Sequence, residues 1–173
     1  MSPTPAVPGP PRLREGTAAD ASAVAALYTA SRRDAYAGLL PPGTLDADAA
    51  QQDLLWELRL TADYGPPADT PVLLLAETPG GPPLGFAHLV PVDGTVRLEH
   101  LHVHPAHTGR GLGGLLLRAA LDRHPATPVR LDVLAANHRA IAFYERHGAR
   151  LLATGTARFP DGTTLPELTY GWR

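Results

Sequence analysis

Four glycines between residues 109 and 114 are the strongest chemical signal in this sequence. Residues 108–114 read TGRGLGG, and they follow an alternating strand and a proline and precede a leucine-rich helix. Glycine leaves backbone N–H groups unobstructed, and the dipole of the following helix adds partial positive charge at the same place. The segment therefore predicts a binding site for phosphate or pyrophosphate at the mouth of a helix.

A dinucleotide-binding turn is one interpretation of these glycines. Gly109, Gly111 and Gly114 match the pattern G-x-G-x-x-G, and Asp132 lies on the next predicted strand, where a ribose-binding acid would be. In that fingerprint the first glycine follows the strand directly, whereas residues 105–108 intervene here. This departure makes the dinucleotide site the weaker alternative.

A histidine series precedes the glycines. His100, His102 and His104 alternate along the predicted strand 95–104, and alternate residues of a strand face the same way. Three imidazoles could bind zinc, with His107 as a further ligand, which gives a metal-dependent enzyme as one hypothesis. The other interpretation is a polar strand face with one neutral or catalytic histidine, and no metal is then expected.

The composition limits the classes of protein. With 173 residues, of which 44% are hydrophobic, the chain can form one domain with a substantial core. A formal net charge of -2 gives no reason to expect nucleic acid or an anionic membrane as a partner. The chain has no Lys and no Cys, which excludes a Walker-type phosphate loop, a lysine Schiff base, disulfides and a thiolate nucleophile.

The first eleven residues differ from the rest of the chain. Residues 1–11 are rich in proline and small side chains, so we expect a disordered tail, followed by a single domain over 12–173. The tail lacks the apolar run of a secretory signal, and the chain lacks an apolar stretch long enough for a membrane span. We therefore expect a cytoplasmic protein.

Hydrophobic periodicity predicts a mixed α/β fold. We expect strands over 12–15, 72–77, 84–92, 95–104, 129–134, 149–158 and 165–172. We expect helices over 18–31, 46–62 and 111–123, and a last helix between Asn137 as N-cap and Gly148. The strands over 72–104 form an antiparallel meander, and the helix after them is the crossover to a parallel strand. The exposed final strand could pair with another copy in a homodimer.

Two ordered motifs resemble the GNAT superfamily of N-acetyltransferases. The acyl-CoA motif of that family is written Gln/Arg-x-x-Gly-x-Gly/Ala, and here Thr108, Gly111 and Gly113 occupy its three positions. The second signature and the family's central strand are matched by Leu131-Asp132-Val133, Asn137, Ala140, Phe143-Tyr144-Glu145, Gly148, Glu99 and Leu101-His102-Val103. The chain departs from the pattern at Thr108, which is shorter than Gln or Arg, and at Ala149, where an aromatic residue often follows the glycine.

The resemblance implies a fold and an activity. The fold is a mostly antiparallel sheet with flanking helices and a splayed pair of parallel strands that binds acetyl-CoA. The activity is acetyl-CoA-dependent transfer to a primary amine of a small molecule or peptide, and the absence of Cys favours direct transfer. A non-catalytic CoA-binding sensor of the same fold is the remaining alternative.

The resemblance also implies roles for particular residues. The expected acetyl-CoA contacts are Leu101, Val103, Thr108, Gly109, Arg110, Gly111, Gly113, Gly114 and Asn137. Tyr144 matches the acid that protonates the leaving thiolate, whose reference pKa of ~8.5 lies below the ~10 of tyrosine. Glu99 is the first candidate for the base that deprotonates the acceptor amine, and His102 is the second. Candidate residues of the acceptor pocket are Tyr36, Leu39, Trp56 and residues 159–163.

Overall fold

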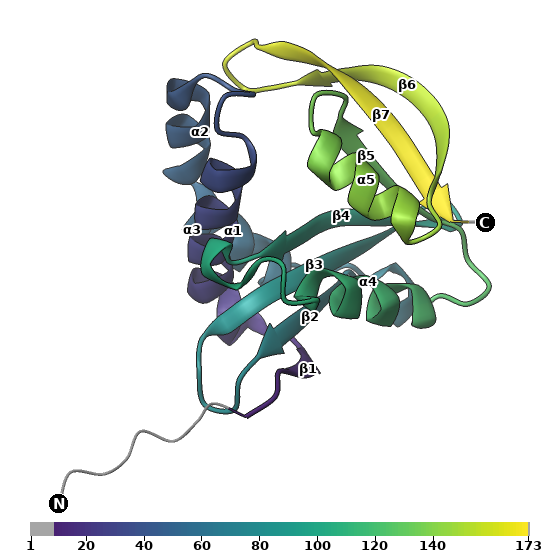
Figure 1. Ribbon diagram of the computed structural model, residues 1–173. Coiled ribbons are helices and arrows are strands. Elements are labelled where there is room, and N and C mark those ends of the chain that lie inside the picture. Colours follow the sequence, from purple (N-terminus) through teal and green to yellow (C-terminus); the bar gives the residue numbers. More distant parts are fainter. Residues whose placement is uncertain (1–8, 173) are drawn as a thin grey trace, which may run out of the picture.

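One seven-stranded sheet runs through residues 9–172, which are the residues that the computed structural model describes (Figure 1). The strands are β1 (Arg12–Glu15), β2 (Val72–Glu77), β3 (Pro83–Val92), β4 (Thr95–Val103), β5 (Val129–Leu134), β6 (Arg150–Arg158) and β7 (Thr164–Trp172). Each differs from its predicted range by at most one residue at either end. The expected tail lies mostly outside the described residues.

The antiparallel half of the sheet follows from local sequence signals. β1 pairs with β2, β2 with β3 and β3 with β4, all antiparallel. The turn between β3 and β4 places Asp93 at φ 47 and Gly94 at φ 74, the left-handed region that Asp-Gly tolerates in a tight hairpin. The predicted meander is confirmed.

The parallel pair is short and then opens. β4 and β5 are in register only at Val96↔Val129 and Arg97↔Arg130. In the β3–β4 ladder, His88 lies opposite His100 and Leu89 opposite Leu98, so Glu99 is the extra residue of a β-bulge. The bulge falls where the two parallel strands begin to separate, which confirms the expected mixed sheet with a splayed pair.

The C-terminal hairpin completes the sheet on the far side of the splay. β7 pairs with β5 along the whole strand, from Val129↔Trp172 to Leu134↔Glu167, and β6 pairs with the other side of β7. The expectation that the final strand lies exposed at the sheet edge is wrong, because β7 pairs with β5 on one side and with β6 on the other. The edge belongs to β6 instead.

Helices cover both faces of the antiparallel strands (Figure 1). They are α1 (Ala21–Ala35), α2 (Pro42–Ala49), α3 (Gln52–Thr61), α4 (Leu112–Asp122) and α5 (His138–Arg146). On one face, α1 and α3 bury Val24 and Trp56 against Phe86 of β3, and all three side chains are fully buried. On the other face, α4 buries Leu116 and Leu117 in a second apolar cluster that also contains β5 and β7 residues.

Two helix predictions need correction. The single helix expected over 46–62 is two helices, α2 and α3, because the chain turns at residues 50–51. The turn lets Trp56 pack beneath α1 while Thr44 of α2 reaches Asp161 in the β6–β7 turn. The helix expected over 18–31 begins as a 3-10 turn and extends to Ala35. None of the helices within residues 9–172 has the length and apolar character needed to cross a bilayer.

Candidate active site

The start of α4 has the geometry of an anion-binding site. Gly111 is the N-cap residue with φ 80, and Gly109 has φ 75. A Cβ at either position would meet open space, so both glycines are explained by their backbone conformation. The first helical bond runs from Leu115 N to Gly111 O at 3.0 Å, which leaves the preceding amides of α4 without an intrahelical acceptor.

The other residues of this turn have separate tasks. The Thr108 hydroxyl donates to the Pro105 carbonyl at 3.1 Å and so closes the turn that leads into the glycines. Arg110 is exposed at the mouth of the helix. A Cβ on Gly113 would lie 3.4 Å from the Phe143 ring, and one on Gly114 would lie 3.0 Å from Nε2 of His147. These two glycines therefore let α5 pack closely against α4.

The strand that precedes the glycines offers a free edge. From Leu98 onward, β4 has no register partner on its β5 side among the described residues. Leu101 and Val103 pack toward the α4 cluster and hold this part of the strand in place. Across the opening, Asn137 caps α5 through a hydrogen bond from Ala140 N to its side-chain oxygen at 3.2 Å. The predicted cap is confirmed, and the separated edges leave backbone groups available to an extended, peptide-like ligand.

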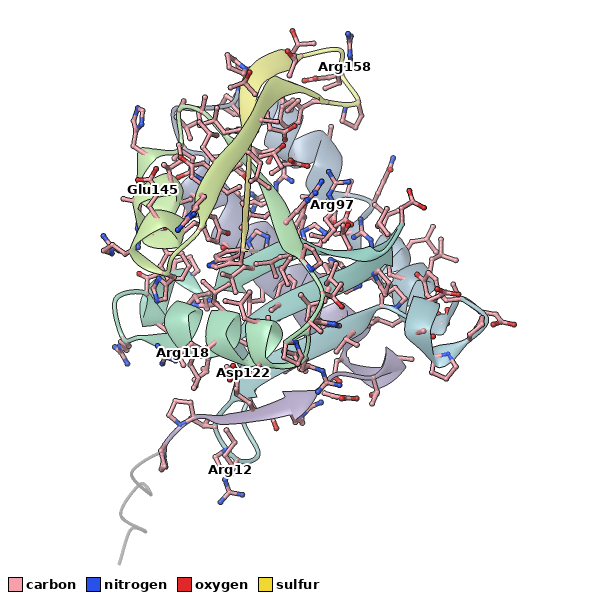
Figure 2. The ribbon with its side chains drawn as sticks, turned by 90° about the vertical axis from the view of Figure 1, so that its right-hand side faces the viewer. Arg12, Arg97, Arg118, Asp122, Glu145 and Arg158 are labelled. Atoms are coloured by element: carbon pink, nitrogen blue, oxygen red, sulfur yellow. The ribbon has the colours of Figure 1, made fainter. Side chains whose placement is uncertain are left out.

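An ion pair holds the closed end of the opening. Arg97 of β4 pairs with Asp132 of β5, and the Thr169 hydroxyl of β7 donates to Asp132 at 2.6 Å. Figure 2 shows Arg97 near the middle of the molecule, beside the strands that separate there. This network links β4, β5 and β7 at the last point where the parallel strands still pair.

A cavity of about 400 Å³ lies beside the bulge. Its walls come from α1, the start of α2, β4, β5 and the β6–β7 hairpin, through Arg32, Tyr36, Thr44, Glu99, Leu134, Ala157, Arg158, Phe159, Pro160 and Glu167. Two carboxylates, Glu99 and Glu167, thus reach one cavity from different strands. A hydrogen bond from the Thr44 hydroxyl to Asp161 joins α2 to the hairpin turn at this cavity.

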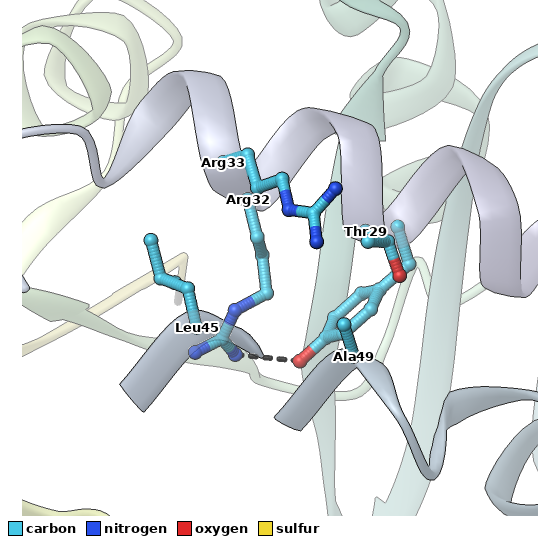
Figure 3. A pocket seen from close by; sticks show the side chains of 6 residues that line it. Thr29, Arg32, Arg33, Leu45 and Ala49 are labelled. Carbon is cyan, nitrogen blue, oxygen red and sulfur yellow. Dashed lines mark hydrogen bonds between the residues drawn. The ribbon is translucent and has the colours of Figure 1, made fainter. Parts of the chain in front are cut away.

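One wall of the cavity is built by Arg32. Its Nη1 donates to the Tyr28 hydroxyl at 2.5 Å, and its guanidinium lies 5.0 Å from the centre of the Tyr36 ring. Figure 3 shows Arg32 of α1 and Leu45 of α2 in a neighbouring recess, with the Tyr28 contact dashed. Arg32 therefore borders both hollows and supports Tyr36 by a cation–π contact.

Three titratable groups around the cavity influence one another. Burial and the nearby Asp132 raise the pKa of Glu167, and Arg97 partly offsets this effect. Burial raises the pKa of Tyr36, which Arg32 lowers and Glu167 raises. Burial also raises the pKa of Tyr144 well above its usual value, and Tyr36 adds to that rise. Tyr144 is therefore a protonated hydroxyl near a carboxylate-bearing cavity.

Packing fixes the position of Tyr144 on α5. Its ring is 5.3 Å from the centre of Phe143 and 6.2 Å from that of Trp172, both in edge-on contacts. Trp172 is itself held by a hydrogen bond from Nε1 to the His147 carbonyl at 2.8 Å. The candidate acid thus projects from a short helix whose position β7 and α4 both determine.

The structure places His104 apart from His100 and His102. His102 lies against Tyr28, with Nδ1 3.0 Å from the Ser31 hydroxyl, and burial lowers its pKa to about 3. His100 lies in the same aromatic cluster, between Trp56 and His102. His104 follows the end of β4, where its Nδ1 accepts a hydrogen bond from the next turn. His102 is therefore a weak base that does not line the cavity, and Glu99 is the better candidate of the two.

These positions give no support to the metal hypothesis. Within residues 9–172 there is no group of three or more His, Asp or Glu side chains arranged to hold a metal ion. His104 leaves the common face on which the zinc interpretation depended, because the strand ends at Val103. A hydrogen bond to Ala106 N at 3.2 Å engages its ring instead.

Only some of the residues predicted for the acceptor pocket line the cavity. Tyr36, Phe159 and Pro160 line the cavity, whereas Trp56 is fully buried in the core and Leu39 is not part of the lining. Sequence reasoning missed Arg32, Thr44, Leu134 and Glu167 as cavity residues. Glu167 carried one weak signal, a carboxylate within an otherwise uncharged strand, but the open face of that strand depends on the splay.

Comparisons with known proteins point to one family. The sequence model of the family described as Acetyltransferase (GNAT) family matches residues 28–149. A probable N-acetyltransferase of Mycobacterium tuberculosis is 26% identical over 167 residues, which cover 92% of this chain and 91% of that protein. A mycothiol acetyltransferase of Thermobispora bispora is 40% identical over 120 residues, which are 66% of this chain but 38% of that protein.

A solved structure shows the same fold. The PaiA N-acetyltransferase of Thermoplasma acidophilum, in complex with coenzyme A, superposes with a TM-score of 0.70 at 17% identity. The match covers 92% of this chain and 98% of that one. Together with the family match over residues 28–149, these similarities show that the chain belongs to the GNAT family of acetyltransferases and is an N-acetyltransferase.

Proposed function

We propose that this protein transfers an acetyl group from acetyl-CoA directly to a primary amine of a small molecule or peptide. The observation that carries the proposal is the short β4–β5 pairing, which opens after Arg97 between the α4 glycine turn and the cavity. A donor bound in the opening would present its acyl group to an acceptor in the cavity. The coenzyme A complex of the Thermoplasma relative supports the same choice of donor.

The binding residues follow from their positions. The amides at the start of α4, together with those of Gly109, Arg110 and Gly111, suit the pyrophosphate of coenzyme A. The free edge of β4 near Leu101 and Val103 suits the amides of the pantetheine arm, as an added strand would. Asn137 caps α5 on the opposite side of the opening, and its side-chain amide is a further candidate contact.

The transfer forms one bond and breaks one, and it removes two protons from the acceptor's ammonium nitrogen while one proton is delivered to sulfur. The amine nitrogen attacks the thioester carbonyl carbon, and a backbone N–H near Val103 would stabilise the developing oxyanion. The carbon–sulfur bond then breaks, and Tyr144 protonates the leaving thiolate. An alkylammonium with a pKa of ~10 must first lose a proton, and a cavity carboxylate is suited to accept it. Glu99 is the carboxylate that the sequence pointed to.

Binding and turnover test the proposal together. Calorimetry should show that acetyl-CoA and CoA bind the folded protein, and thiol release should be measured with putrescine, glucosamine, kanamycin and trialanine as acceptors. We expect binding and acceptor-dependent release of CoA. Binding without release for any amine would favour the sensor, and absence of binding by a folded protein would refute the assignment.

Gly111→Ala should weaken CoA binding about tenfold. The φ of 80 places a side chain in the left-handed region, which costs roughly 1–2 kcal/mol, and relief of that strain would turn the amides away from the phosphates. A tenfold change corresponds to about 1.4 kcal/mol and is measurable by calorimetry.

Gly94→Ala is the matched control, because its φ is 74 and open space surrounds it in the β3–β4 turn. Both variants should lose similar stability in chemical unfolding, and only Gly111→Ala should lose affinity for CoA. Equal affinities in the two variants would contradict the glycine turn as the phosphate site.

A further inference from the structure

We propose that Glu167 is the general base of the transfer and that Glu99 anchors the acceptor as an ammonium ion. The inference rests on the proposed function, since it assigns roles within the same reaction. It starts from the cavity, where these two carboxylates enter from strands on opposite sides of the opening. Glu99 comes from the bulge of β4, and Glu167 comes from β7, opposite Leu134 at the end of β5.

The position of Tyr144 distinguishes between the two carboxylates. Proton removal from nitrogen and proton donation to sulfur take place on atoms bonded to the same carbon, so base and acid must lie close together. Tyr36 interacts electrostatically with Glu167 on one side and with Tyr144 on the other. Tyr36, which lines the cavity, therefore links Glu167 to the candidate acid.

The surroundings of Glu167 also suit a base. Burial and Asp132 of β5 raise the pKa of Glu167, while Arg97 of β4 lowers it and so favours the charged carboxylate. The other charged or titratable groups that face the cavity are Arg32 and Tyr36 of α1, Glu99 of β4 and Arg158 of β6. Glu99, in contrast, is exposed, whereas Glu167 is half-buried. Two carboxylates in unlike environments take different roles.

Each proton that moves in the proposed step has a donor and an acceptor. A proton of the acceptor's ammonium group passes to a carboxylate oxygen of Glu167, directly or through one water molecule. The nitrogen lone pair then forms the bond to the acetyl carbon, and the carbon–sulfur bond breaks as Tyr144 gives its proton to sulfur. The second nitrogen proton passes through water to the Tyr144 oxygen, and Glu167 releases its proton to solvent, so both groups return to their starting states. Glu99 takes no proton in this step and holds the amine by a charge-assisted hydrogen bond.

Glu167→Gln tests the assignment through kcat and its pH profile. With acetyl-CoA and the amine of the panel that wild-type protein acetylates fastest, we expect kcat about 100-fold lower and the acceptor KM within a few-fold. The wild-type kcat should fall as the pH decreases through the raised pKa of Glu167, and the variant should lose this acidic limb. Glu99→Gln should instead raise the acceptor KM about tenfold and keep the limb.

Controls separate this inference from folding and from the proposed function. Glu57→Gln, on the exposed side of α3, should leave both kinetic constants unchanged, and all variants should bind CoA as the wild type does. Wild-type kcat and an intact acidic limb in Glu167→Gln, or loss of that limb in Glu99→Gln, would overturn the assignment of roles. A folded wild-type protein without amine turnover would instead overturn the proposed function, and with it this inference.

Discussion

Tyr144→Phe is expected to lower kcat about 100-fold while CoA binding stays unchanged. The change removes only the hydroxyl that protonates the leaving thiolate, and general acid catalysis typically contributes a factor of this order or more. Because burial and Tyr36 raise the pKa of Tyr144, the hydroxyl stays protonated above its usual range. The rate should therefore not fall through deprotonation of Tyr144 as the pH rises toward 10. Steady-state thiol release between pH 6 and pH 10 measures both effects.

Tyr64→Phe provides the comparison, because this exposed tyrosine only donates a hydrogen bond to the Arg59 carbonyl at 3.0 Å. It should match the wild type in kcat and in CoA affinity. A Tyr144→Phe enzyme with at least half of the wild-type kcat would refute the role of the hydroxyl and leave the fold assignment in place.

Acidification from pH 7 to pH 5 should destabilise the protein by several kcal/mol. His88, His100 and His102 lie between the sheet and the α1–α3 layer, and burial lowers the pKa of His88 to about 4 and that of His102 to about 3. In the unfolded chain these groups have a pKa of ~6.5, so the unfolded state binds more protons and stability falls as the pH drops below that value. His88 alone accounts for about 2 kcal/mol at pH 5.

Urea unfolding at the two pH values tests this expectation. Neither ring nitrogen of His88 has a hydrogen-bond partner among the described residues, and Trp56 lies 5.2 Å away in edge-on contact. His88→Phe should therefore be stable at pH 7 and should lose about 2 kcal/mol less than the wild type on acidification. Equal losses in both proteins would show that other groups control the acid response.

Local sequence signals predicted the elements well because each has a local physical cause. Asp93-Gly94 forms the hairpin turn, Asn137 caps α5, and Gly148 ends that helix with φ 87, as glycine does after a last helical turn. The break between α2 and α3 was missed because it depends on tertiary contacts. Trp56 and Thr44 have distant partners, and no proline or glycine marks residues 50–51.

The site was predictable in part. The glycine turn and Tyr144 lie in contiguous motifs, so their neighbourhoods could be inferred from the chain alone. The position of Glu167 could not be inferred in this way, because it requires β5 to diverge from β4 and β7 to pair with the other edge of β5. The prediction that His104 shares a strand face with His100 and His102 failed for a related reason. The strand ends one residue before His104, and no periodicity indicates that boundary.

The insertion of β7 between β5 and β6 has a consequence for how the molecule is assembled. β5 has only two register pairs with β4, so its ladder stays largely unpaired until residues 164–172 have been synthesised. During translation the meander of β2, β3 and β4 can form from neighbouring segments, but the wall that carries Glu167 cannot. The nascent chain should therefore form the β2–β4 framework beside the proposed acetyl-CoA site before the cavity proposed for the acceptor. Truncation before residue 164 would leave β6 without its partner and β5 with only its two register pairs to β4.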